Sequence, residues 1–255
     1  MLSDLTTLRR RLQASPLDDE TALIEAAVLY RSVTAPPPTP RPGSVSRPVG
    51  LVELDALTSF DTADAAERFA AAVARGCGVT PYVTCEVRGI RHKHEMHVVR
   101  VDEASQHAVR TALSTGWRNA HAGLLSSVPN GAILSGARRT GPTAIAVWRA
   151  LLLSTTPVRN NAGLRLRLRD ADLLSLAVRA AQVLGASTHT RSTAGLGVLC
   201  VDDPEQAYRL VENLLPRLPA MRRLAARRVP VQPTPATRPA RYATPPGPGR
   251  VAAAR

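Results

Sequence analysis

Two segments far apart in this 255-residue chain repeat the same local pattern. Val101-Asp102 followed by Gln106 matches Val201-Asp202 followed by Gln206, and at each place a predicted strand leads into an acid-capped helix. Asp61 and Asp170 also end a strand and open a helix that glycine closes. Because both matches keep the same order of elements, internal duplication explains them better than chance does. We therefore expect two half-domains of one topology.

Hydrophobic periodicity predicts the elements of each half. In the first half we expect a helical segment 5–33 interrupted near Ser15-Pro16, a strand 51–60, a helix from Asp61 to Arg75 stopped by Gly76 and Gly78, a hairpin of 82–87 and 96–101, and a helix 103–113. In the second half we expect a helix beginning at Pro142, a strand 164–168, a helix 171–184 ended by Gly185, a hairpin of 187–191 and 197–201, and a helix 204–215. The order helix-strand-helix-hairpin-helix, twice over, predicts an α+β (mixed αβ) fold.

Composition divides the chain further. The first half-domain, 1–115, contains a Pro-rich loop at 35–48, and the second half-domain is predicted to cover 141–220. Between them, the Gly-, Ser- and Asn-rich segment 116–140 is predicted to be a linking loop. The basic, Pro- and Arg-rich tail 221–255 is expected to be disordered, because it cannot bury enough apolar surface to offset chain entropy.

The charge of the chain favours polyanionic partners. The net charge is +13, carried almost entirely by arginine since Lys93 is the only lysine. An aromatic content of 3% disfavours a base-stacking surface for single strands. Three isolated cysteines, no apolar leader and no membrane-length apolar run predict a cytoplasmic protein without disulfides.

Two strings resemble the WhiA family of bacterial regulators. They are SFDTADAAERFAAAVARGCGVTPYV in the first half and AILSGARRTGPTAIAVWRALLLSTTPV at the start of the second, and the similarity covers roughly residues 5–220. The resemblance implies a LAGLIDADG-like pseudo-two-fold saddle, similar to homing endonucleases, in a regulator of sporulation and cell division. In that family a C-terminal helix-turn-helix domain makes most DNA contacts. Residues 221–255 contain no pair of amphipathic helices, so that element is expected to be missing and sequence-specific binding is in doubt.

The ends of the two predicted central helices decide whether nuclease chemistry is expected. A LAGLIDADG nuclease needs an acidic residue at the C-terminal end of each, because paired carboxylates there hold the metal ions that activate water. The corresponding segments, 28–32 and 152–156, read VLYRS and LLSTT and contain no carboxylate. We therefore expect no enzyme activity, no cofactor and no metal at this place, and a residual nuclease is the least favoured function.

The string LRLRLR at 164–169 is the sharpest surface pattern. Alternation in a strand would bury the leucines and place Arg165, Arg167 and Arg169 in an outward row, about 7 Å apart, close to the spacing of phosphates along a DNA strand. Arg138 and Arg139, and Arg88, Arg91 and Lys93 of the first hairpin, are further candidate phosphate contacts. The alternative reading is a solvated strand face in an arginine-rich protein.

Two function hypotheses follow. The first is a WhiA-like, non-catalytic transcriptional regulator that binds double-stranded DNA mainly through phosphates, alone or with another regulatory protein. The second is a protein–protein interaction module without DNA binding. The second is favoured by Glu53 and Asp55, which put acidic charge on the outward face of the first half's strand, where a duplex would bind poorly. The sequence leaves the oligomeric state open.

The first hairpin also contains three histidines, His92, His94 and His97. Alternation would place His92 and His94 on one face, a geometry that could bind Zn²⁺ or Ni²⁺ if other ligands converged. A solvated basic turn is the alternative interpretation.

Overall fold

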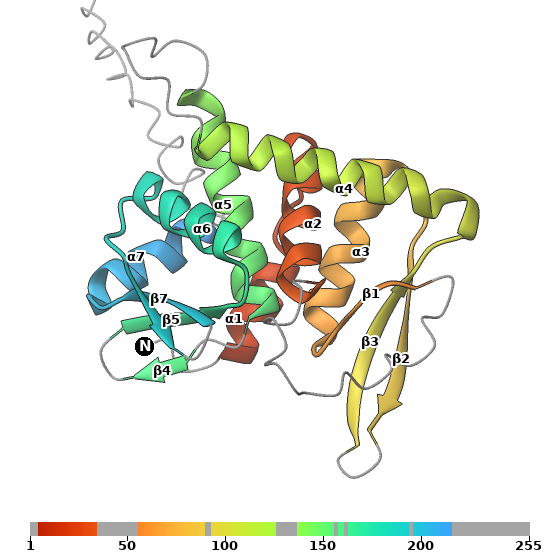
Figure 1. Ribbon diagram of the computed structural model, residues 1–255, viewed down its shortest axis with the longest axis horizontal. Helices are drawn as coiled ribbons and strands as arrows, with labels where there is room; N and C mark the ends of the chain where they lie inside the picture. Colours follow the sequence, from red (N-terminus) through yellow and green to blue (C-terminus); the bar gives the residue numbers. More distant parts are fainter. Residues whose placement is uncertain are drawn as a thin grey trace, which may run out of the picture. The chain divides into compact units, whose positions relative to one another are not determined.

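The computed structural model describes residues 5–34, 56–89, 93–125, 137–155, 158–160, 163–193 and 196–215, which all lie within one compact unit, Met1–Pro216 (Figure 1). Several predictions fall outside these residues: the Pro-rich loop 35–48, the acidic pair Glu53 and Asp55, Arg91 and His92 of the first hairpin, and the tail 221–255.

The duplicated order of elements is confirmed. The first half contains α1 (Leu5–Gln13), α2 (Asp19–Thr34), β1 (Ala56–Phe60), α3 (Ala63–Cys77), β2 (Tyr82–Arg88), β3 (His94–Arg100) and α4 (Glu103–Leu124). The second contains α5 (Ala137–Ser154), β4 (Val158–Asn160), β5 (Gly163–Leu168), α6 (Ala171–Val183), β6 (His189–Thr193), β7 (Leu196–Val201) and α7 (Pro204–Leu214). The fold is therefore mixed αβ, as the periodicity predicts.

Each half forms its own antiparallel sheet. The first sheet has the order β1-β3-β2, and the second repeats it as β5-β7-β6 with the short strand β4 added beside β5. Helix α3 packs on the first sheet, and α6 and α7 pack on the second. The central helices α2 and α5 pack against each other, and α4 crosses over the helices on the side away from the sheets (Figure 1).

Helix caps fix how the two halves correspond. Thr62 is the N-cap of α3 and Asp170 the N-cap of α6, where its carboxylate accepts hydrogen bonds from the amides of Asp172 and Leu173. Thus Asp170 is equivalent to Thr62, and the expected equivalence with Asp61 is wrong by one residue. A similar shift occurs at the following helices, because α4 is capped by Asp102 but α7 by Asp203. The shift leaves Asp202 free of any capping role.

The segment 116–140, predicted to be a linking loop, is helical at both ends. Helix α4 continues to Leu124 instead of ending at Leu113, and α5 begins at Ala137 instead of Pro142, which lies inside the helix. The physical reason for the longer α4 is tertiary packing, which overrides the low helix propensity of glycine. A Cβ on Gly116 would lie 2.5 Å from the carbonyl oxygen of Leu23 in α2, so glycine permits the close contact.

Gly76 has the same role on the other side of Leu23. It lies inside α3 and does not stop the helix, and a Cβ there would lie 3.2 Å from the Cβ of Leu23. The helix ends at Gly78, whose φ of 69° is the left-handed conformation that glycine adopts without strain. Leu23 is therefore held between two close-approach glycines, which ties α2 to α3 and α4.

A buried ion pair anchors the N-terminal helix. Arg68 of α3 donates two hydrogen bonds to the carboxylate of Glu25 in α2, at 2.6 and 3.0 Å, and both side chains are 2% exposed. Arg68 also donates to the carbonyl oxygen of Gln13, the last residue of α1, and to that of Ser15, which follows the helix. A buried charge is costly unless an opposite charge and hydrogen-bond partners compensate it, and Arg68 has both. This network fixes α1 beside the central helices.

None of the described helices combines the length and the apolar character that crossing a bilayer requires.

Candidate nucleic-acid interface

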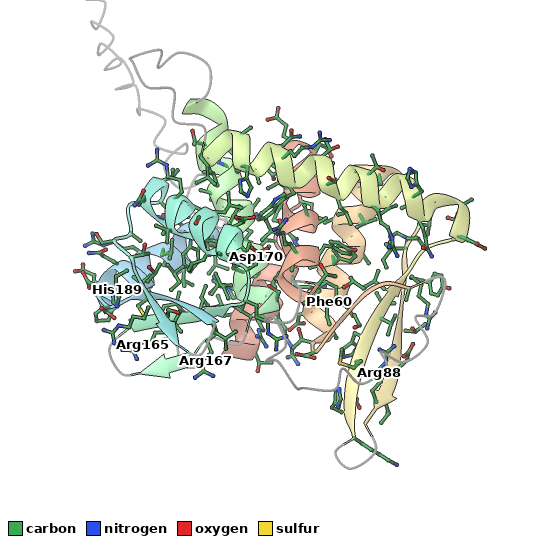
Figure 2. All side chains as sticks on the ribbon, viewed as in Figure 1. Phe60, Arg88, Arg165, Arg167, Asp170 and His189 are labelled. Atoms are coloured by element: carbon green, nitrogen blue, oxygen red, sulfur yellow. The ribbon has the colours of Figure 1, made fainter. Side chains whose placement is uncertain are left out.

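Strand β5 presents arginine on one face only. Leu164, Leu166 and Leu168 are buried, Arg165 is half-buried, and Arg167 and Arg169 are exposed. Figure 2 shows Arg165 and Arg167 on the side of the second sheet away from α6. The alternation predicted from LRLRLR is therefore the arrangement in the structure, and strand geometry places successive arginines about 7 Å apart.

The sheet register adds a fourth arginine to this face. Arg167 lies opposite Val198 of β7, and Val198 lies opposite Arg191 of β6. Directly paired residues point to the same side of a sheet, so Arg191 lies about 10 Å across the sheet from Arg167. Sequence reasoning missed Arg191 because its position depends on which residues pair. We call Arg165, Arg167, Arg169 and Arg191 the arginine face.

Two members of the arginine face are free to accept an anion. Within the residues that the structure describes, Arg167 and Arg169 make no ion pair or hydrogen bond through their guanidinium groups. Arg191 donates a hydrogen bond to the ring of His189, with 3.1 Å between Nε and Nε2. No carboxylate of the described residues therefore pairs directly with Arg167, Arg169 or Arg191.

The basic residues predicted on the first hairpin behave differently. Arg88 binds the carboxylate of Glu86 at 2.7 and 3.0 Å, and Arg100 binds the same carboxylate at 2.7 Å. Figure 2 shows Arg88 on the first sheet, apart from Arg165 and Arg167. Lys93 is exposed beside β3. The structure therefore does not bring Arg88 into the arginine face, and Glu86 offsets part of its charge.

Arg138 and Arg139 lie in the first turn of α5, and the structure gives no description of their side chains. Their role as phosphate contacts stays a prediction.

Arg167 and Arg169 also line a cavity of about 570 Å³ at the C-terminal ends of the central helices. Its walls come from equivalent positions of the two halves. The equivalent pairs are Ser59 and Arg167, Phe60 and Leu168, Asp61 and Arg169, Thr62 and Asp170, Ala65 and Leu173, and Met96 and Leu196. The lining is completed by Arg9, by Ser32 and Val33 of α2, and by Ser154 and Thr155 at the C-terminal end of α5. The equivalence supports the duplication, and it gives the two halves opposite charges, Asp61 and Arg169, at matching positions of the lining.

Arg9 comes from α1, which lies outside the duplicated unit. Its guanidinium donates to the carbonyl oxygen of Thr155 at 2.8 Å and to that of Leu152 at 3.4 Å. Burial lowers its pKa, which the charges of Asp64 and Asp61 counteract, and an arginine stays protonated under such conditions. A permanent positive charge therefore caps the negative end of the α5 dipole.

Asp170, the carboxylate equivalent in position to Thr62, already has partners. Besides capping α6, it accepts a hydrogen bond from Arg31 of α2, which also reaches Asp172 at 3.1 Å. Burial raises the pKa of Asp170, but hydrogen bonds from Arg31 and from backbone amides outweigh this effect and hold the pKa below its usual range. Asp170 is a structural anion that joins α2 to α6.

The cavity does not fit the divalent ion of a LAGLIDADG nuclease. The helix ends contribute Ser32, Val33, Ser154 and Thr155, none of which is a carboxylate. The Arg9 guanidinium occupies the carbonyl end of α5 and would repel a cation. In the described part of the chain, clusters of metal-ligating side chains occur on the two hairpins instead.

No protein-family model and no curated protein matches the sequence. Among solved structures, the chain is similar to the N-terminal LAGLIDADG domain of DUF199/WhiA, with 10% identity and a TM-score of 0.50, over 88% of this chain and 97% of that one. The chain has a LAGLIDADG-type fold. Full-length DUF199/WhiA from Thermatoga maritima also matches, with 10% identity and a TM-score of 0.50, over 86% of this chain and 65% of that one. This chain therefore spans about two thirds of the full-length protein.

The WhiA-like resemblance seen in the sequence is thereby confirmed for the fold. A structure of I-DmoI in complex with DNA and Mn is also similar, with 13% identity and a TM-score of 0.46, over 78% of this chain and 99% of that one.

Proposed function

We propose that this chain binds double-stranded DNA without cleaving it, through contacts between the arginine face and backbone phosphates. The observation that carries the proposal is the row formed by Arg165, Arg167 and Arg169, of which the last two have no partner in the described residues and enter the cavity. Their spacing of about 7 Å suits successive phosphates along one strand. The net charge of +13 adds long-range attraction.

Such contacts hold a duplex but do not read its sequence, because phosphates are the same at every base pair. Arg9 in the cavity, where the nuclease metal would lie, supports binding without cleavage. Following the WhiA-like resemblance, we further propose a bacterial, cytoplasmic regulatory role linked to sporulation or cell division. The half-domain boundaries 1–115 and 141–220 stay predictions within this proposal.

The test is an electrophoretic mobility shift with the full chain and a short duplex at two salt concentrations. The variant replaces Arg165, Arg167 and Arg169 by Ala. The matched control replaces Arg110, Arg118 and Arg209 by Ala, which are exposed arginines on α4 and α7. Both variants lose three positive charges, so long-range attraction falls equally and only the contact residues differ.

We expect the wild-type chain and the control to shift the duplex at low salt, with a steep loss of affinity as salt rises. The arginine-face variant should bind at least about tenfold more weakly and show a shallower salt dependence, because about three phosphate contacts are gone. Equal binding by the two variants would locate the interface elsewhere. No shift by the wild-type chain at low salt would exclude DNA binding.

The protein-interaction alternative is favoured by one observation. Tyr82 and Val87 are 49% and 64% exposed, and both lie on β2, an edge strand of the first sheet. Exposed apolar side chains on an edge strand are typical of a surface that a partner covers. If the wild-type chain shifts no DNA, this edge becomes the surface to investigate.

A further inference from the structure

The β2–β3 hairpin brings three metal-ligating side chains together. Cys85 of β2 lies directly opposite His97 of β3, and Glu95 lies two residues before His97 on the same strand. Because alternate residues share a face of a sheet, all three side chains point to one side. The Cys85 thiol, a His97 ring nitrogen and a Glu95 carboxylate oxygen all lie within 4.8 Å of one another.

We propose that Cys85, Glu95 and His97 form a Zn²⁺ site that joins the two strands of this hairpin. Zn²⁺ accepts thiolate, imidazole and carboxylate ligands at about 2.0–2.3 Å in a tetrahedral arrangement, which sets the ligand atoms roughly 3.5 Å apart. Small side-chain rotations close the remaining distance. Three protein ligands leave the fourth position to a water molecule.

The three side chains are accessible and uncommitted. Cys85 and Glu95 are exposed and His97 is half-buried. None of them makes a hydrogen bond or an ion pair with another residue that the structure describes. An ion would therefore break no existing contact of these groups. With the thiol deprotonated, the ligands carry two negative charges that match the ion.

The expectation that His92 and His94 share one face stays untested, but the structure separates His94 from His97. His94 lies opposite Arg88, three residues from His97, and so projects from the other face of the strand. His92 lies outside the described residues. The site depends instead on Cys85, whose pairing with His97 is set by the strand register.

The second hairpin offers a natural comparison. His189 lies directly opposite Cys200, with Asp202 two residues beyond, so the same ligand types occur with Cys and His exchanged between strands. Here both ring nitrogens of His189 are in use. Nδ1 is 3.0 Å from the Asp202 carboxylate, and Nε2 accepts a hydrogen bond from Arg191.

Two further features oppose an ion at the second hairpin. Cys200 is 1% exposed, and Arg165 lies directly opposite it on β5. A cation there would have to displace existing bonds beside two guanidinium groups. We therefore assign the ion to the first hairpin alone.

The test uses the metal-free full chain titrated with Zn²⁺ in competition with a chromophoric chelator, and with Co²⁺ as a spectroscopic probe. We expect one Zn²⁺ per chain and, with Co²⁺, an intense near-ultraviolet band from thiolate-to-metal charge transfer. Cys85→Ser should remove the band, and both Cys85→Ser and His97→Asn should weaken Zn²⁺ binding at least about tenfold. Cys85 is exposed and His97 is half-buried, and circular dichroism checks that each variant is folded.

Cys200→Ser is the matched control for the thiol, and His94→Asn is the control for the imidazole. Both should keep the stoichiometry, the affinity and the charge-transfer band. The proposal is overturned if Cys85→Ser binds Zn²⁺ as wild type does, or if the loss follows Cys200 or His94 instead. The experiment contains no DNA, so its outcome is independent of the proposed function.

Discussion

At the scale of single residues, the cavity shows how a few charges change the chemistry open to a fold. Arg9 caps the carbonyl end of α5, and Asp170 is held by Arg31 and by the first amides of α6. Both charged groups are therefore already bonded within the protein. Among the described residues, the charged groups of the cavity that remain without a hydrogen bond or ion pair are the guanidinium groups of Arg167 and Arg169 and the carboxylate of Asp61.

The lowered pKa of Asp170 predicts a pH dependence of stability. When the folded-state pKa of a carboxyl group is depressed, its contribution is complete above the unfolded-state pKa and is lost as pH falls through the folded-state value. We expect the free energy of unfolding to fall from about pH 5 downward. Asp170→Asn keeps an N-cap acceptor but loses the ion pair, so it should be less stable at pH 7 by roughly 1–3 kcal/mol.

Urea unfolding at pH 7 and pH 3 measures this effect. The difference between wild type and Asp170→Asn should shrink at pH 3, where the wild-type carboxyl group is becoming protonated. Asp172→Asn is the control, because Asp172 is 65% exposed and its contact with Arg31 is worth little. Equal acid sensitivity of wild type and Asp170→Asn would contradict the assignment.

At the scale of elements, the packing of α4 depends on Gly116, although glycine has a low helix propensity. Replacing a helical glycine by alanine usually stabilises a protein by up to about 1 kcal/mol. At Gly116 the new Cβ would lie 2.5 Å from the backbone oxygen of Leu23, so α2 and α4 would have to separate. We expect Gly116→Ala to destabilise the protein by about 1–3 kcal/mol, as measured by urea unfolding.

Gly123 of the same helix provides the matched control. A Cβ there would lie 3.6 Å from Thr143, which is ordinary contact, so Gly123→Ala should be neutral or stabilising by up to about 1 kcal/mol. Stabilisation by both substitutions would show that the close contact with Leu23 does not limit α4.

The sequence predicts most elements because their periodicity is strong, as in α6 and α7, where apolar spacing and acidic N-caps agree. It does not predict the full length of α4, because a Gly- and Ser-rich composition resembles a loop unless the packing against α2 is known. It also misses β4, whose three residues are too few to show alternation. Local sequence is least informative where tertiary contacts decide the structure.

At the scale of the whole molecule, both halves deliver non-acidic helix ends to the cavity. We therefore expect the full chain to leave supercoiled plasmid DNA intact with Mg²⁺ or Mn²⁺, since no pair of carboxylates is placed to hold an ion at both helix ends. Gel analysis of nicked and linear products measures this. Nicking that Asp61→Asn abolishes would refute the non-catalytic proposal.

The candidate site could be predicted only in part. The row Arg165, Arg167 and Arg169 follows from alternation within one strand, so the sequence suffices for it. Arg191 and the pair Cys85 and His97 depend on strand register, which alternation alone does not specify. Arg9 comes from α1, a helix outside the repeat. It reaches the cavity because hydrogen bonds from Arg68 hold the end of α1 beside the central helices.

The opposite charges of Asp61 and Arg169, at matching positions of the two halves, have a directional consequence. The backbone of a duplex looks nearly the same after a half-turn about an axis perpendicular to it, so a fully symmetric protein could hold it in two equal ways. Here one half of the cavity repels phosphate while the other attracts it. A bound duplex would therefore be displaced toward β5. The two halves would contact the DNA unequally, although their folds are equivalent.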